Sequence, residues 1–207
     1  MSHVRVAIPK KGFERFEKYN PENLKSFEQL IEEQNGDTYC LKLNMHLLRM
    51  YNAYPQLVNL KITRLILLKA LSKLPYQHFN FARKYLIWSQ LIDDGIRVII
   101  DMADLLENED YEEFWMHYKQ KATILPILDG FDEAIRKYIC FKVGSTRTTV
   151  PCMEFKMKLA VDKEVLMKYI TQLGWMINGN EVKVFPLMLN DSNDRDVIRG
   201  IICSDIR

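Results

Sequence analysis

The chain has 207 residues, of which 48% are hydrophobic and 27% are charged, and its formal net charge is +2 at pH 7. This composition predicts a globular protein with a sizeable apolar core and excludes a disordered or loop-rich chain. A net charge so close to zero gives no general electrostatic attraction to nucleic acid.

The N-terminal residues 1–17 are predicted to form a flexible basic arm, because Arg5, Lys10, Lys11 and Arg15 dominate its charge. The first helix begins after this arm. Asn20-Pro21 is a typical helix start, since Asn is a good N-cap and Pro is tolerated at the first helical position.

Residues 18–128 are predicted to form six helices, because apolar residues recur there at helical spacing. The expected spans are approximately 20–35, 38–51, 56–74, 78–91, 96–106 and 110 onward. Short connections make successive helices antiparallel neighbours. We therefore expect a stack of helical hairpins that resembles a HEAT or TPR array, although no repeat consensus recurs at a fixed period.

The pattern changes in residues 129–186. A helix is expected from Phe131 to about Val143, with Gly144 as its end. The β-branched segment 146–150 then predicts a short strand.

Two helices and a hairpin complete this second region. Pro151 opens a short helix, and Asp162 caps another that Gly174 ends. Residues 175–185 predict a hairpin, because Asn178-Gly179 is a strong turn signal in which both residues accept positive φ. Helix, strand, helix, helix, hairpin is the order of a winged helix. The predicted fold is therefore mainly α: a HEAT/TPR-like helical stack followed by a small winged-helix domain.

Residues 187–207 form a C-terminal tail, for which we favour a helix over a third wing strand. As a helix, the tail would present a single apolar stripe, made by Val197, Ile198, Ile201 and Ile202. An isolated helix of this length is marginal in water, so the stripe needs a surface to dock on. We expect that surface to belong to a partner protein; the chain's own winged helix is the alternative.

The sequence predicts no enzyme activity, no catalytic residue, no metal site and no cofactor. Its glycines occur singly, so no phosphate-binding loop is available, and the common hydrolase and metalloprotease motifs are absent. Short-range metal ligands often stand three or four residues apart. None of the four histidines has such a spacing to another His or Cys; they are His3, His46, His78 and His117.

The sequence also gives an expectation for location. No C-x-x-C pair is present, no apolar signal segment precedes residue 20, and no apolar run approaches membrane-spanning length. We expect a cytoplasmic protein, with a nuclear pool as an alternative. Its cysteines are then reduced and serve as small core residues.

The charge pattern disfavours a nucleic-acid-binding winged helix. Between Asp93 and Glu113 there are nine acidic residues and one basic residue, Arg97. In the presumed recognition helix and wing, acidic and basic residues cancel: Asp162, Lys163, Glu164, Lys168, Glu181 and Lys183. Binding at physiological salt requires several phosphate contacts, so neither strong RNA nor strong DNA binding is expected. We therefore expect the winged helix to bind other proteins.

Short stretches along the chain carry a resemblance to known proteins, in the same order and at similar spacings. They are Tyr19–Leu24, Leu67–Leu71 with Leu74-Pro75, Asp104–Glu107 with Phe114-Trp115, Gly130-Phe131, Ile135–Cys140, Val143-Gly144 and Gly174-Trp175. The chain is similar to PCI-type scaffold subunits, and among these it resembles the subunit K family of eukaryotic translation initiation factor 3.

This resemblance implies a non-catalytic subunit of initiation factor 3 that pairs with subunit L and meets the small ribosomal subunit through the complex. In such subunits the winged-helix sheets align edge to edge and C-terminal helices join a shared bundle. The candidate partner interface is therefore Trp175, Val182, Val184, Phe185, Val197, Ile198, Ile201 and Ile202. A scaffold subunit of the proteasome lid or signalosome is the alternative, and a nucleic-acid-binding winged helix is less favoured.

Overall fold

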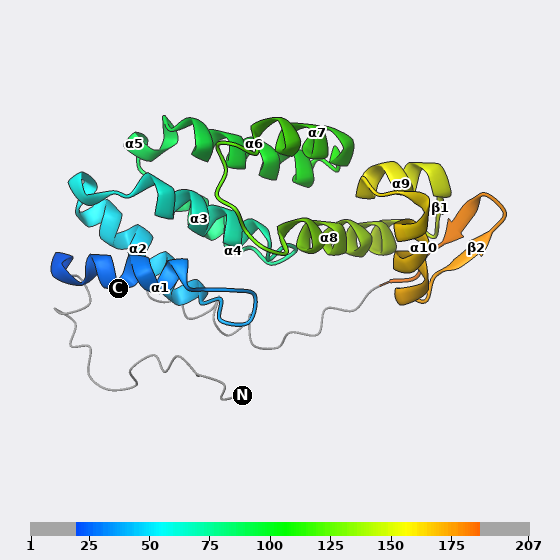
Figure 1. Ribbon diagram of the computed structural model, residues 1–207, viewed down its shortest axis with the longest axis horizontal. Coiled ribbons are helices and arrows are strands. Elements are labelled where there is room, and N and C mark those ends of the chain that lie inside the picture. The colour runs from blue at the N-terminus through cyan, green and yellow to red at the C-terminus, as the bar shows by residue number, and fades with distance from the viewer. Residues whose placement is uncertain (1–19, 187–207) are drawn as a thin grey trace.

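The structure, a computed structural model, describes residues 20–186 of the chain. Layers of helices occupy one end of the molecule and a small sheet occupies the other (Figure 1). The predicted fold class, a mainly α helical stack followed by a small sheet-containing unit, is confirmed. The basic arm and the C-terminal tail lie outside the described residues.

The first helices pack as antiparallel neighbours, as their short connections predict. Asn20 is the N-cap of the first described 3-10 helix, because its side chain accepts a hydrogen bond of 3.0 Å from the Glu22 N–H. The elements in this part are a 3-10 helix Pro21–Asn23, α1 (Leu24–Glu32), α2 (Leu41–Ala53), a 3-10 helix Pro55–Leu57 and α3 (Leu60–Leu71).

Helix α3 is the centre of the stack. It is buried along most of its length, as its high apolar content predicts. Its buried Lys69 crosses to the end of α1, where its ammonium donates hydrogen bonds to the carbonyl oxygens of Ile31 and Gln34. Both carbonyls lie at the C-terminal end of α1 or just beyond it, so Lys69 supplies hydrogen bonds to this helix end from another helix. Burial of the ammonium lowers the pKa of Lys69 to about 8.

The prediction of one helix over 78–91 is wrong. The structure has two short helices, α4 (His78–Lys84) and α5 (Trp88–Leu91). Gln90 holds the second one in place: its Oε1 accepts from the Ile87 N–H at 3.0 Å, and its Nε2 donates to the Thr63 hydroxyl at 2.9 Å. Gln90 is fully buried, so its contact with α3 redirects the chain where no Gly or Pro is present.

The next hairpin consists of α6 (Asp94–Glu107) and α7 (Tyr111–Lys121). Asp93 caps α6, because its carboxylate accepts a 2.9 Å hydrogen bond from the Ile96 N–H. Asp110 precedes α7 as predicted, but its side chain makes no capping hydrogen bond. Acidic residues in the first turn of α7 instead match the positive end of the helix dipole.

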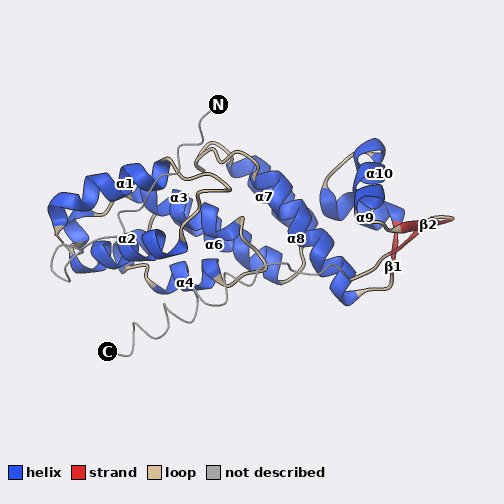
Figure 2. Cartoon of the chain, turned by 90° about the horizontal axis from the view of Figure 1, so that it is seen from below, coloured by secondary structure: helices blue, strands red, loops and turns tan. Residues whose placement is uncertain are grey.

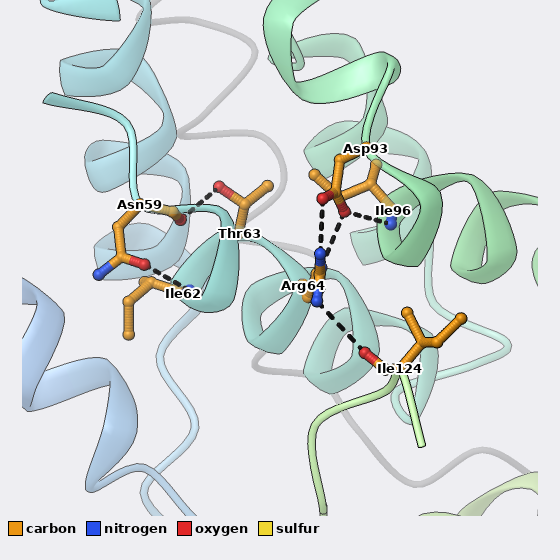
Figure 3. Close-up of polar contacts among 7 residues, drawn as sticks. All are labelled: Asn59, Ile62, Thr63, Arg64, Asp93, Ile96 and Ile124. Carbon is orange, nitrogen blue, oxygen red and sulfur yellow. Dashed lines mark hydrogen bonds and ion pairs between the residues drawn. The ribbon is translucent and has the colours of Figure 1, made fainter. Parts of the chain in front are cut away.

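Arg64 joins three segments of the stack (Figure 3). Its guanidinium donates two hydrogen bonds to the Asp93 carboxylate, at 2.8 and 2.5 Å, and a third to the Ile124 carbonyl at 3.3 Å. These bonds lower the pKa of Asp93 and raise that of Arg64. Gly95 leaves room for the guanidinium, since a Cβ there would lie 2.4 Å from the Arg64 Nε. One side chain of α3 thus fixes the start of α6 and the segment that follows α7.

The long helix α8 (Phe131–Thr146) leads from the stack to the sheet, and Figure 2 shows the sheet at the end away from α1 and α2. The predicted end at Gly144 is wrong, because α8 continues through it. A Cβ at Gly144 would lie 2.8 Å from the Phe185 carbonyl oxygen and 3.1 Å from the Trp175 ring. Glycine is needed there for close packing, and it does not stop the helix.

The remaining elements follow the predicted winged-helix order. They are β1 (Thr149–Pro151), α9 (Cys152–Leu159), α10 (Lys163–Gln172), β2 (Met176–Asn178) and β3 (Glu181–Lys183). Strand β1 begins later than predicted, because Thr146 still belongs to α8. Asp162 caps α10 as expected, with 2.8 Å between its carboxylate and the Val165 nitrogen, and Gly174 follows with φ of 66°. The sheet is antiparallel in the order β1-β3-β2.

Candidate protein interface

The predicted hairpin is present, but its turn differs in detail. Asn178 pairs with Glu181, so the two-residue turn is Gly179-Asn180. Gly179 has φ of 61°, whereas Asn178 is part of the strand and has no positive φ. Glycine at the first central position suits a hairpin turn that matches the strand twist.

The structure places three candidate interface residues inside the winged helix. Trp175, Val182 and Val184 are all buried, and only Phe185 is exposed, at 40%. The Trp175 indole donates a 3.1 Å hydrogen bond to the Phe185 carbonyl. These buried side chains support the hairpin from within.

The structure places Val184 beside the central strand of the sheet. Strand β3 is the central strand, and the Val184 N–H already donates to the Thr148 carbonyl at 3.0 Å. The other strand of the hairpin, β2, forms one edge of the sheet, and β1 forms the other.

The hydrogen-bond pattern shows which backbone groups of β2 bond to no other strand within residues 20–186. In an antiparallel ladder, alternate residues of a strand bond to opposite neighbours. Val184 and Asn180 bond to the β1 side, so Glu181 and Lys183 bond to β2. Ile177 lies opposite Val182, between those two pairs. Its N–H and C=O therefore point away from the sheet.

The β1 edge is less suited to a further strand. By the same alternation, Thr149 and Pro151 direct their backbone groups outward, since Val150 pairs with Val182. Pro151 has no N–H, and proline on an edge strand hinders the addition of another strand. The β2 edge is thus the more open of the two.

Exposed apolar side chains accompany the β2 edge. Met176 is 59% exposed and Ile177 is 41% exposed. Ile177 shares the core-facing side of the sheet with buried Val182, whereas Met176 lies opposite Lys183 on the outer side. The sequence indicated these residues only as strand members, because the partner of each strand had to be known before an edge could be assigned.

The winged helix is fixed to the stack by polar contacts through α9. The Trp115 indole on α7 donates to the Lys158 carbonyl at 2.9 Å, and the Arg136 Nε on α8 donates to the Leu159 carbonyl at 3.0 Å. The Arg136 guanidinium also lies 4.9 Å from the centre of the Trp115 ring. Both carbonyls belong to the C-terminal turn of α9, so the stack supplies donors to a helix end. The β2 edge is consequently held in a defined orientation.

The described residues contain no arrangement suited to metal binding, and the buried Cys140 thiol is not suited to attack as a thiolate. Between residues 20 and 186, no group of three or more His, Cys, Asp or Glu is placed to hold a metal ion. Burial raises the pKa of the Cys140 thiol to about 12, so it stays protonated and packs as a small apolar side chain.

In the same part of the chain, no helix is both long and apolar enough to cross a membrane.

The remaining candidate residues, Val197, Ile198, Ile201 and Ile202, lie outside the described residues. The stripe they would form stays a prediction. The predicted domain boundaries at residues 17, 128 and 186 likewise stay predictions, although the order of elements on either side of residue 128 agrees with them.

A helical stack joined through one long helix to a winged helix with an open sheet edge defines a PCI-like scaffold protein. A model of the CSN8/PSMD8/EIF3K family matches residues 57–190. Eukaryotic translation initiation factor 3 subunit K of Drosophila persimilis is 35% identical over 187 residues, which is 89% of this chain and 84% of that protein. The subunit K proteins of Aedes aegypti and Drosophila virilis are 36% and 34% identical over 171 and 170 residues, each covering 81% of this chain and 77% of theirs. The chain belongs to the CSN8/PSMD8/EIF3K family and, within it, to the subunit K proteins of eukaryotic translation initiation factor 3.

Proposed function

We propose that this protein is a non-catalytic subunit of the eukaryotic translation initiation factor 3 complex and docks to a neighbouring subunit through the β2 edge of its winged helix. The observation that carries the docking proposal is the outward direction of the Ile177 N–H and C=O beside exposed Met176. An unpaired edge strand offers main-chain hydrogen bonds to an added strand, and neighbouring side chains give specificity.

Subunit L is the proposed partner at this edge, and contact with the small ribosomal subunit is proposed to occur through the complex. In this arrangement Phe185 contacts the neighbour directly, while Trp175, Val182 and Val184 hold the hairpin from within. The apolar stripe of the tail, 197–202, is proposed to join helices of other subunits. A cytoplasmic location follows from this role.

RNA is not the proposed partner of the winged helix. Near its surface, Glu154 already pairs with Arg147 at 2.7 Å and with Lys158 at 3.5 Å. The acidic residues of α6 and α7 would repel a phosphate backbone. We expect RNA binding by the isolated chain to be weak and to have a shallow salt dependence.

A scaffold subunit of the proteasome lid or the signalosome is the second candidate. The fold alone does not separate it from an initiation factor subunit. The relatives described above all carry the name of initiation factor 3 subunit K, which favours the first candidate.

Replacing Ile177 by proline tests the docking proposal. The change removes an N–H that the hairpin itself does not use, and proline is tolerated on an edge strand whose N–H faces solvent. We expect the tagged variant to recover initiation factor 3 subunits about tenfold less efficiently, which corresponds to about 1.4 kcal/mol. Its thermal stability should stay within a few degrees of the unmodified chain.

Ile177→Thr is the matched control, because threonine keeps the N–H and suits a strand. It should bind better than the proline variant. Tryptophan emission, compared between the two variants in a Trp88→Phe background, reports whether the hairpin over Trp175 remains folded. Undiminished recovery of Ile177→Pro with an intact hairpin would remove the β2 edge from the interface.

A further inference from the structure

An exposed apolar face lies on the short helix α5. Trp88 and Ile92 are 78% and 60% exposed, and residues four apart lie on the same side of a helix. The opposite side of α5 carries buried Gln90, which bonds to Thr63 on α3. The inward side of α5 is therefore anchored, while no described residue covers its outward side.

Two exposed leucines lie at the same end of the stack. Leu57 ends the 3-10 helix before α3, and Leu60 is the first residue of α3; they are 40% and 36% exposed. The bond from Gln90 to Thr63 places α5 against the first turns of α3, and Figure 1 shows α5 at this end. We call Leu57, Leu60, Trp88 and Ile92 the end patch. Exposed apolar patches mark sites that another segment or molecule covers.

The chain enters the stack at this same end. Gln34 donates to Asn44 at 3.0 Å and Tyr51 donates to Glu28 at 2.5 Å, so α1 and α2 run antiparallel. The start of α1 therefore lies beside the end of α2, from which the chain continues directly to Leu57. Residues 1–19 precede the described part of the chain and are therefore connected to the stack at this end.

We propose that residues 1–19 of this chain cover the end patch. This segment contains five apolar residues suited to the patch: Val4, Val6, Ile8, Phe13 and Phe16. From α1 to α5 the chain must cross about two helix layers, roughly 20 Å. Nineteen residues span up to about 60 Å when extended, so the length is ample.

Covering the end patch would cap the helical stack. Stacked helical repeats bury apolar faces between neighbours, and their terminal units need a cap that keeps the outer face polar. A flexible, undocked arm is the competing outcome.

Fluorine NMR of the full-length chain labelled with 5-fluorotryptophan tests this proposal. Of its three tryptophans, Trp115 and Trp175 are buried and serve as internal references, and Trp88→Phe assigns the third resonance. We expect the Trp88 resonance to show little solvent isotope shift in the unmodified chain. In the double variant Phe13→Ser, Phe16→Ser the shift should appear.

The double variant Glu14→Ser, Glu17→Ser is the matched control, because it changes the same segment without removing apolar groups. It should leave the Trp88 resonance unchanged. A Trp88 that is solvent-accessible in the unmodified chain, or equally shielded in the Phe13, Phe16 variant, would overturn the proposal. Shielding that disappears on dilution would also overturn it, by assigning the patch to a second copy of the chain.

Limited trypsin digestion provides a reciprocal test in the full-length chain. Cleavage after Lys10 and Lys11 requires this segment to leave the surface, and its rate follows the undocked population. The variant Trp88→Ser, Ile92→Ser should be cut there about tenfold faster than the unmodified chain, which corresponds to about 1.4 kcal/mol of docking free energy. Met153→Ser with Met157→Ser, an exposed pair with the same spacing on α9, is the control. Equal cleavage rates in all three proteins would contradict the proposal.

Discussion

The junction between Arg64 and Asp93 gives the sharpest stability prediction. Asp93 holds the α3 guanidinium through two hydrogen bonds and also caps α6. The side chain of Arg64 is 26% exposed and that of Asp93 is 10% exposed. Asp93→Asn keeps the cap and the shape but removes the charge, so Arg64 loses its ion-pair partner.

We expect this change to cost about 2–3 kcal/mol of unfolding free energy. That lies between about 0–1 kcal/mol for an exposed pair and about 3–5 kcal/mol for breaking a buried one. For a chain of this size it lowers the melting temperature by roughly 5–10 °C. Asp93→Ala also removes the cap and should cost about 1 kcal/mol more.

Urea and thermal unfolding measure these differences, and Asp104→Asn is the matched control. Asp104 pairs with Arg83 at 2.7 Å, but both side chains are more than 40% exposed. This change should cost at most about 1 kcal/mol. Equal destabilisation by Asp93→Asn and Asp104→Asn would refute the role given to Arg64.

The same pair predicts a pH dependence. The folded-state pKa of Asp93 lies below its ordinary value. The unfolded chain therefore binds the proton more readily, and the pair's contribution is present above the unfolded pKa and lost as pH falls through the folded one. Below about pH 4 the difference in unfolding free energy between the unmodified chain and Asp93→Asn should therefore shrink. A difference that stays constant down to pH 2 would contradict the ion-pair explanation.

Three further predictions concern other parts of the chain. Gly144→Ala should destabilise the chain by about 1–3 kcal/mol in thermal melts, because its Cβ would overlap the Phe185 carbonyl. The low pKa of Lys69 means that the unfolded chain binds more protons between about pH 8 and 10.5. The unfolding free energy of the unmodified chain, relative to Lys69→Met, should therefore rise with pH in that interval. A decrease with pH would contradict the lowered pKa of Lys69. The double change Ile198→Asp, Ile202→Asp should abolish complex assembly but leave the melting temperature of the lone subunit nearly unchanged; loss of several degrees would place the stripe in the subunit's own core.

Signals that act within a few residues could be predicted from the sequence. Asn20 and Asp162 cap their helices because short polar side chains reach the nearby N–H groups. Gly174 and the turn at Gly179 follow from positive φ. The order of elements in the winged helix followed from these markers together with hydrophobic periodicity.

Features that depend on distant contacts could not be predicted. The break before α5 has no Gly or Pro, and it is specified by Gln90 reaching Thr63, 27 residues away. Gly144 was interpreted as a stop, whereas its neighbours Trp175 and Phe185 come about 30 and 40 residues later in the chain.

The positions of the candidate interface residues in the sheet could not be predicted for the same reason. A hairpin considered alone has two edges, and β1 decides which of them is covered. Because β1 pairs with β3, Val182 lies on the central strand, and Ile177 lies on the edge strand β2. The exposure of Trp88 could not be predicted either. Which side of the helix Trp88 and Gln90 occupy depends on where α5 begins.

The central claim is that this chain works as a subunit of eukaryotic translation initiation factor 3. Affinity purification of the tagged full-length chain from its own cells, followed by quantitative mass spectrometry, tests it most directly. The claim predicts recovery of the initiation factor 3 subunits in near-stoichiometric amounts, with subunit L retained longest as salt is raised. Recovery of proteasome lid or signalosome subunits in their place would contradict it.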